Sequence, residues 1–139
     1  MYLTYEEYEQ MGGELDEPAF NEYEFEAESY VDWYTFNRLQ NETDIPLTVK
    51  RLIFKIVKRV TQQAALSGLT SNSDNSELGG AAIASRSNDG VSESYNIISA
   101  SELLQNSKAA INEDIKRYLN GVSNSLGRKL LYRGLYPGE

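Results

Sequence analysis

The sequence predicts a mainly α fold, a small bundle of three to four helices with a protruding β-hairpin and an extended C-terminal arm. Three long stretches carry apolar residues three or four positions apart, which is the spacing of an amphipathic helix. Two capping-box patterns and an Asp-Gly pair between alternating segments mark helix starts and a hairpin turn. We expect residues 1–127 to form the helical domain, with the hairpin inserted at about 81–97, and residues 128–139 to form the arm.

Length and composition exclude several classes of protein. A chain of 139 residues has the size of a single domain. It contains no cysteine, which excludes a disulfide framework, and no histidine, which excludes an imidazole base or ligand. No apolar run approaches the ~18 residues of a membrane-spanning helix, and the acidic N-terminus is unlike a signal peptide. We therefore expect a protein of a cytoplasm-like compartment that does not enter a membrane.

The first two helices are predicted from their capping residues. Thr4 and Glu7 have the spacing of a capping box, so a short helix should follow to about Met11. Asp16 is placed to cap a second helix, with Pro18 in its first turn. The side of this second helix that should be buried consists of Phe20, Tyr23, Ala27, Tyr30, Val31 and Tyr34.

The stretch 46–67 predicts the central helix. Pro46 suits its first turn, and Gly68 can adopt the left-handed conformation that closes a helix. The short connection 35–45 should make the second helix and this one antiparallel neighbours. The apolar stripe of the central helix consists of Val49, Leu52, Ile53, Ile56, Val57, Val60 and Ala64.

Charge is distributed unevenly along the chain, whose net charge is −8. The first 45 residues hold thirteen carboxylates and one base, whereas the remainder holds eight carboxylates and twelve bases. One interpretation is that acidic and basic faces meet within a subunit or between copies of it. The other is solvated helix faces whose ion pairs each contribute ~0–1 kcal/mol. The candidate inter-subunit faces are formed by Glu22, Glu24, Glu26, Glu28, Lys55, Lys58 and Arg59.

The part of the chain after the central helix begins with a polar loop at 68–80. Apolar and polar residues then alternate on both sides of a turn, which predicts the hairpin. The tip of the hairpin consists of Arg86, Ser87, Asn88, Asp89 and Gly90. A second capping box at Ser99–Glu102 opens the last helix, which Asn120-Gly121 should end. The buried stripe of that helix is Leu104, Ala110, Ile111, Ile115, Tyr118 and Leu119.

The C-terminal arm combines apolar, aromatic and basic residues. Free tails are usually polar, and Tyr and Arg concentrate at interface hot spots. The arm therefore either docks on a partner or packs on its own domain. The candidate docking residues are Leu130, Leu131, Tyr132, Arg133, Leu135 and Tyr136.

Residues that could support catalysis are sparse in this sequence. The glycine pairs lack the spacing of a phosphate-binding loop, and a serine nucleophile would have no histidine to accept its proton. The carboxylates of residues 6–28 lie on predicted solvated faces, and none of them resembles a calcium loop. We expect no catalytic residues, no cofactor and no metal, and therefore no enzyme.

Several stretches, taken together and in the same order, give the chain a resemblance to a known family. These are Leu3–Tyr8 with Met11–Gly13, the Glu-rich helix after Phe20, Tyr34–Leu39, the hairpin Ser85–Tyr95 and Leu130–Gly134. They resemble the head–tail connector (adaptor) proteins of long-tailed double-stranded DNA bacteriophages. The similarity covers most of the chain, and Leu130–Gly134 is its most specific part.

The resemblance implies a structural virion protein, made in the bacterial host cytoplasm and located in the virion neck at the head–tail interface. It implies a ring, expected to be a dodecamer, that joins the portal protein to the stopper or tail and continues the channel for non-specific passage of double-stranded DNA. The arm should grip the portal or the adjacent subunit, and the hairpin should face the channel or the stopper. The alternatives are a small acidic regulatory or DNA-mimic binding protein, or another neck or tail-completion protein.

Overall fold

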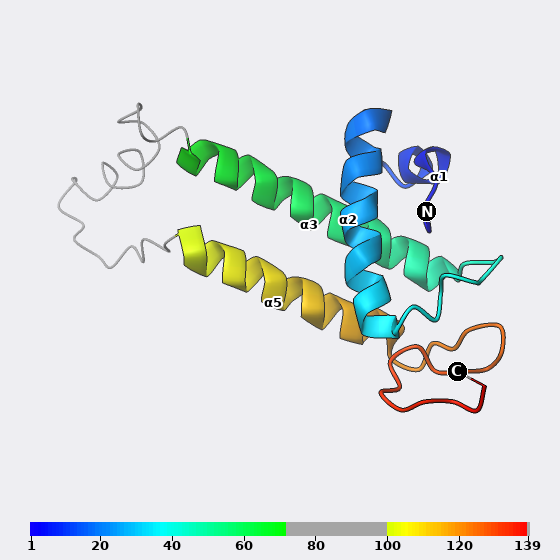
Figure 1. Cartoon of the computed structure of the whole chain (residues 1–139). Helices are drawn as coiled ribbons and strands as arrows, with labels where there is room; N and C mark the ends of the chain where they lie inside the picture. The colour runs from blue at the N-terminus through cyan, green and yellow to red at the C-terminus, as the bar shows by residue number, and fades with distance from the viewer. Residues whose placement is uncertain (72–99, 139) are drawn as a thin grey trace.

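The computed structural model describes residues 1–71 and 100–138, and this part of the chain is mainly helical. Its helices are α1 (Tyr5–Gln10), α2 (Glu17–Thr35), α3 (Leu47–Ser71) and α5 (Ala100–Leu119), shown in Figure 1. The predicted mainly α class is confirmed. The predicted hairpin at 81–97, with its tip Arg86–Gly90, lies outside the described residues. No helix within the described ranges is long and apolar enough to cross a membrane.

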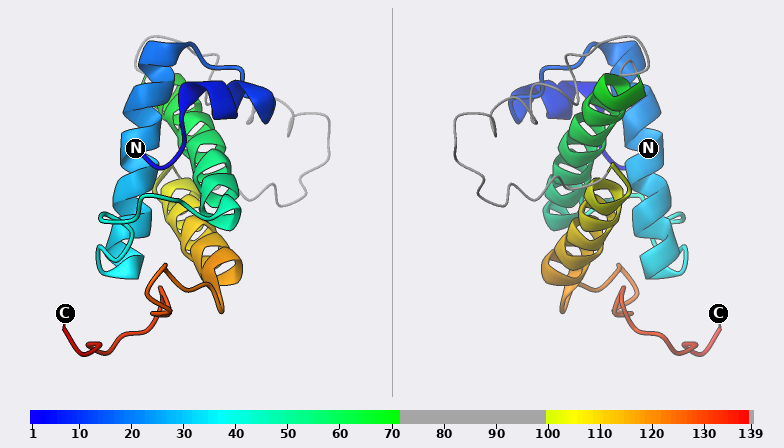
Figure 2. Two further views of the ribbon diagram at one scale, coloured as in Figure 1. Left: turned by 90° about the vertical axis from the view of Figure 1, so that its right-hand side faces the viewer. Right: turned by 90° about the vertical axis from the view of Figure 1, so that its left-hand side faces the viewer.

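Helices α3 and α5 run antiparallel, and α2 lies across them (Figures 1 and 2). The short helix α1 lies beside α2. The prediction that α2 and α3 are neighbours is confirmed, but α2 crosses α3 and does not run antiparallel along it. The apolar stripe of α3 is buried by two helices, because α5 packs along it and α2 crosses it.

The core forms around α3. Six of its seven predicted stripe residues are at most 6% exposed, namely Val49, Leu52, Ile53, Ile56, Val57 and Val60. They share one hydrophobic cluster with fully buried residues of the two neighbouring helices: Phe20, Ala27 and Val31 of α2, and Ile111, Ile115 and Leu119 of α5. Burial of each large apolar side chain contributes about 1.5–3 kcal/mol, so this cluster is the main source of stability.

The helix ends follow the sequence signals only in part. The capping box at Thr4 and the Asp16 cap are confirmed, and Gly121 has the positive φ that ends α5. However, α3 continues past Gly68 to Ser71. The predicted core residues Ala64 and Leu104 are exposed.

Tyr8 connects α1 to the core. Its ring centroid lies 4.6 Å from that of Phe20 and 5.5 Å from that of Phe54. The ring also lies against the backbone of Gly13, where an added Cβ would come within 2.1 Å of it. Gly13 is therefore required for close approach of the chain to this aromatic cluster.

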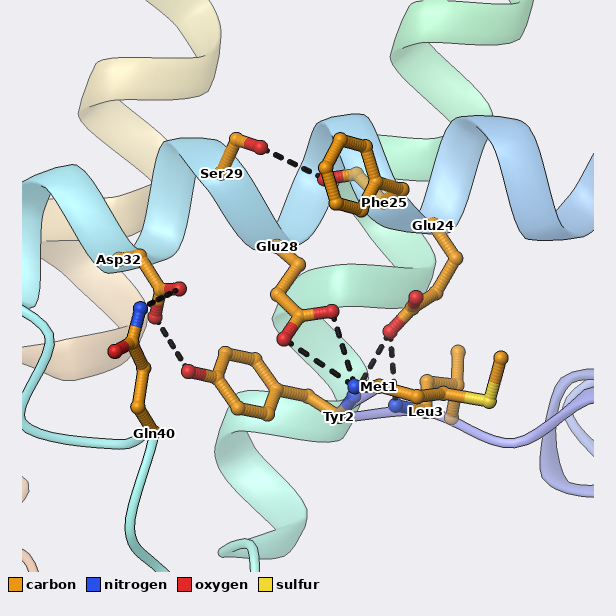
Figure 3. A network of polar contacts seen from close by, with 9 residues as sticks. All are labelled: Met1, Tyr2, Leu3, Glu24, Phe25, Glu28, Ser29, Asp32 and Gln40. Atoms are coloured by element: carbon orange, nitrogen blue, oxygen red, sulfur yellow. Dashed lines mark hydrogen bonds and ion pairs between the residues drawn. The ribbon is translucent and has the colours of Figure 1, made fainter.

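Glu24 is a buried carboxylate on α2 that holds the start of the chain, as Figure 3 shows. Its Oε1 accepts hydrogen bonds from the N–H groups of Tyr2 at 2.8 Å and Leu3 at 3.3 Å. Burial raises its pKa, and the two N–H donors offset part of that rise. One turn further along, Glu28 pairs with the N-terminal amine at 3.1 Å. The assignment of Glu24 to an inter-subunit face is wrong, because it is buried within the subunit. Glu28 is partly buried, and its place in such a face stays a prediction.

Asp114 of α5 is the second buried carboxylate, and it pairs with two bases of α3. Its oxygens lie 3.1 Å from Lys55 Nζ and 2.7 Å from Arg59 Nε. Burial raises the pKa of Asp114, but the hydrogen bonds from Lys55 and Arg59 outweigh this effect, so the net pKa is lowered. Lys55 and Arg59 therefore join α3 to α5. Both remain partly exposed, and their place in an inter-subunit face stays a prediction.

We predict that Glu24→Leu lowers the free energy of unfolding by about 2–4 kcal/mol, because two buried N–H groups lose their acceptor. Glu24→Gln keeps an oxygen at that place and should cost less than about 1.5 kcal/mol. Glu22→Leu, on the exposed side of the same helix, is the matched control and should change stability by about 0.5 kcal/mol or less. Urea unfolding measures all three, and equal losses for both Glu24 variants would contradict the hydrogen-bonding role.

The lowered pKa of Asp114 predicts a pH dependence of stability. Its contribution is fully present above the unfolded-state pKa of about 3.9 and is lost as pH falls through the lower folded-state pKa. Asp114→Asn should therefore destabilise the protein by about 1–3 kcal/mol at pH 7, and the difference from wild type should shrink below about pH 4. Urea unfolding at a series of pH values tests this, and a difference that is independent of pH would refute it.

Candidate docking surface

The chain after α5 is held in place by Arg38, a buried arginine that follows α2. Its Nη1 donates to the carbonyl oxygens of Lys129 at 3.1 Å, Leu130 at 3.2 Å and Tyr132, and its Nη2 donates to that of Gly134 at 2.7 Å. One guanidinium thus engages four carbonyl groups within six residues. We call residues 128–138 the C-terminal loop.

A strained turn aims Arg38 at this loop. Phe36 and Asn37 both have left-handed backbone conformations, with φ of 54° and 58°, which is unfavourable for a bulky residue such as Phe36. The Arg38 guanidinium lies 5.2 Å from the centre of the Phe36 ring and 5.1 Å from that of Tyr136. Cation–π contacts and the planar array of N–H donors explain why an arginine suits this place.

The predicted docking residues divide into buried and exposed groups. Leu130 is fully buried in the core cluster, so its assignment to docking is wrong. Leu131 and Tyr136 are partly buried, and the Tyr136 hydroxyl accepts from the Lys129 N–H at 2.9 Å. In contrast, Tyr132 is 50% exposed, Leu135 is 84% exposed, and Arg133 is exposed. The C-terminal loop therefore packs on its own domain through one side and presents apolar side chains on the other.

A second exposed apolar surface lies on α2, and its apolar residues are not among those predicted from the sequence to form a site. Phe25 is 71% exposed and Trp33 is 79% exposed. They lie two helical turns apart, on the side opposite the buried positions of this helix. We call this surface the α2 outer face, formed by Glu22, Phe25, Glu26, Ser29 and Trp33. The signal was present in the sequence, since both aromatic residues fall outside the predicted buried stripe.

Two grooves flank Trp33. One has a volume of about 740 Å³ and is lined by Asp32, Trp33, Tyr34, Phe36, Asn37, Lys116, Leu131 and Arg133. The other, of about 460 Å³, lies between α2 and α5 and is lined by Glu26, Ser29, Tyr30, Trp33, Tyr34, Lys108 and Asn112. The indole thus stands between two concave regions, which is the kind of position that interface hot spots occupy.

Of the residues assigned to inter-subunit charge faces, Glu22, Glu26 and Lys58 remain exposed. In the ranges 1–71 and 100–138, no ion pair involves any of these three. Glu22 and Glu26 belong to the α2 outer face, whereas Lys58 lies on α3 beside a small pocket next to Gly13. The acidic face available to a partner is therefore narrower than the sequence suggested.

We predict that Arg38→Lys releases the C-terminal loop, because a single ammonium cannot satisfy four carbonyl groups in this geometry. The free energy of unfolding should fall by at least about 1.5–3 kcal/mol, the value of one charge-assisted hydrogen bond. Amide hydrogen exchange should accelerate at Leu130, whose N–H donates to the Val122 carbonyl, while α3 stays protected. Unchanged exchange at Leu130 would show that the loop does not depend on Arg38.

Both surfaces combine large exposed apolar side chains with charged neighbours, a composition typical of protein–protein contacts. In the part of the chain that the structure describes, no group of three or more acidic side chains could hold a metal ion. No protein-family model, no curated protein and no solved structure matches this chain.

Proposed function

We propose that this protein is a structural subunit of a bacteriophage head–tail connector. Copies of it form a ring, expected to be a dodecamer, that joins the portal protein to the stopper or tail and continues the DNA channel. The proposal is supported mainly by the conformation of the C-terminal loop. Arg38 holds this loop in place, and the side chains of Tyr132 and Leu135 are exposed to solvent. The most specific part of the resemblance to connector proteins, Leu130–Gly134, lies in this loop.

A loop that is ordered before binding suits a role in assembly. Ordering a flexible arm at the moment of docking would cost conformational free energy, and pre-organisation removes most of that cost. Tyr132 and Leu135 supply apolar contact area, and Arg133 and Lys129 supply positive charge at its edge. In the proposed function this loop contacts either the portal or the adjacent subunit.

The remaining parts of the proposal concern the channel. The carboxylates in the first 45 residues that are not used within the subunit would repel the phosphates of passing DNA, so that the duplex slides without adhering. The segment 81–97, which lies outside the described residues, is assigned in this proposal to the channel or the stopper.

We predict that the double variant Tyr132→Ala/Leu135→Ala keeps its fold but no longer sediments with portal-bearing capsids that lack this protein. Its circular dichroism and urea midpoint should match wild type, because both side chains are half or more exposed. Deletion of residues 128–139 is a poorer test, since it also removes the buried Leu130 and the acceptors of Arg38.

The matched control is Leu126→Ala, since Leu126 is 70% exposed but lies outside the C-terminal loop. This variant should bind capsids as wild type does. Mass spectrometry of finished particles provides a second measurement, because a connector subunit is a component of the virion. Absence of the protein from the particle, or full docking by the double variant, would remove the proposed function.

A further inference from the structure

We infer that the α2 outer face is the binding site for the C-terminal loop of a neighbouring copy of this chain. The inference rests on the proposed function and names one contact of the proposed ring. It follows from three observations: both surfaces are apolar, they carry opposite charges beside Phe25 and Tyr132, and the loop of the same chain reaches only the Trp33 end of the α2 outer face.

Each of the two surfaces presents two large apolar side chains that are half or more exposed. The α2 outer face presents Phe25 and Trp33 at 71% and 79% exposure, two helical turns apart. The C-terminal loop presents Tyr132 and Leu135 at 50% and 84% exposure. Aromatic and aliphatic side chains exposed to this degree bury substantial area on docking, and tyrosine and tryptophan are the commonest hot-spot residues.

The charges beside Phe25 and those beside Tyr132 are opposite in sign. Glu22 and Glu26 flank Phe25 on α2, whereas Lys129 and Arg133 flank Tyr132 in the loop. All four residues are exposed, and none forms an ion pair with another described residue. Opposite charges at the rim of an apolar contact steer association and select its orientation.

The loop of the same chain cannot cover this face. Arg38 fixes that loop at the C-terminal end of α2, where Leu131 and Arg133 line one groove beside Trp33 and Phe36. Phe25 lies eight residues before Trp33, which corresponds to about 12 Å along the helix. The N-terminal part of the face is therefore left for a loop from another copy.

A contact between two different surfaces is heterologous, so each copy can bind one neighbour through its loop and another through α2. Such contacts repeat around a ring when the rotation closes. A two-fold contact of α2 against α2 would instead gather Glu22 and Glu26 of both copies in one interface. The charge pattern favours the heterologous arrangement.

Disulfide cross-linking tests this contact. The full chain contains no cysteine, so every disulfide between copies must join cysteines introduced by mutation. Ser29→Cys marks the centre of the α2 outer face, and Leu135→Cys marks the loop. The two single variants are mixed, oxidised both free and on portal-bearing capsids, and analysed by intact mass. We expect a disulfide between Ser29→Cys and Leu135→Cys in about tenfold excess over either homodimer, equivalent to about 1.4 kcal/mol of preference.

Gln10→Cys, at the exposed end of α1, is the matched control and should give little product with Leu135→Cys. Adding Glu22→Lys/Glu26→Lys to the Ser29→Cys chain should reduce the mixed product about tenfold. Adding Lys129→Glu/Arg133→Glu to the Leu135→Cys chain as well should restore the mixed disulfide, because the two surfaces then carry opposite charges again. Circular dichroism checks that each variant is folded.

A dominant Ser29→Cys homodimer would overturn the inference in favour of a two-fold contact. A mixed product in no more than the statistical excess over each homodimer would show random collision. Either result leaves the proposed function standing if the protein is found in virions and docks on capsids. Absence from virions would instead remove the proposed function, whichever disulfides form. The two failures are therefore distinguishable.

Discussion

The interaction of Arg38 with the C-terminal loop is the constraint on which the docking surface depends. A guanidinium that is nearly inaccessible to water must be satisfied by protein acceptors, and here four backbone carbonyl groups supply them. This requirement selects one conformation of residues 129–134. Leu130 is then directed into the core, and Tyr132 and Leu135 are directed outward. A segment without regular secondary structure is thereby given the fixed shape that a docking surface needs.

The two buried carboxylates have a comparable role on the other sides of the molecule. Glu24 satisfies the N–H groups of Tyr2 and Leu3, so the first residues of the chain pack against α2. Nearby, the Tyr2 hydroxyl donates to Asp32, and burial together with this hydrogen bond raises the pKa of Tyr2. Asp114 joins α5 to two bases of α3. Glu24, Glu28 and Asp114 therefore hold elements of one subunit together.

Two groups of exposed charges lie beside large exposed apolar side chains. On α2 these charges are negative, and in the C-terminal loop they are positive. Apolar area supplies most of the binding free energy at protein contacts, while rim charges set orientation and association rate. In the proposed function, these two surfaces make the contacts between copies of the subunit and with the neighbouring rings.

The sequence by itself determined the helices, the N-caps of α1 and α2 and the six buried residues of α3, because helical periodicity and capping are local properties that depend on neighbours within one or two turns. The tertiary structure alone decided which charged residues face inward, since Glu22, Glu24, Glu26 and Glu28 are chemically alike and differ only in what packs against them. It also decided that Leu130 is core while Leu135 is exposed, because the conformation of the loop depends on Arg38, some ninety residues earlier in the chain. Contacts between residues so distant in sequence leave no periodic signal, and only the folded chain brings them together.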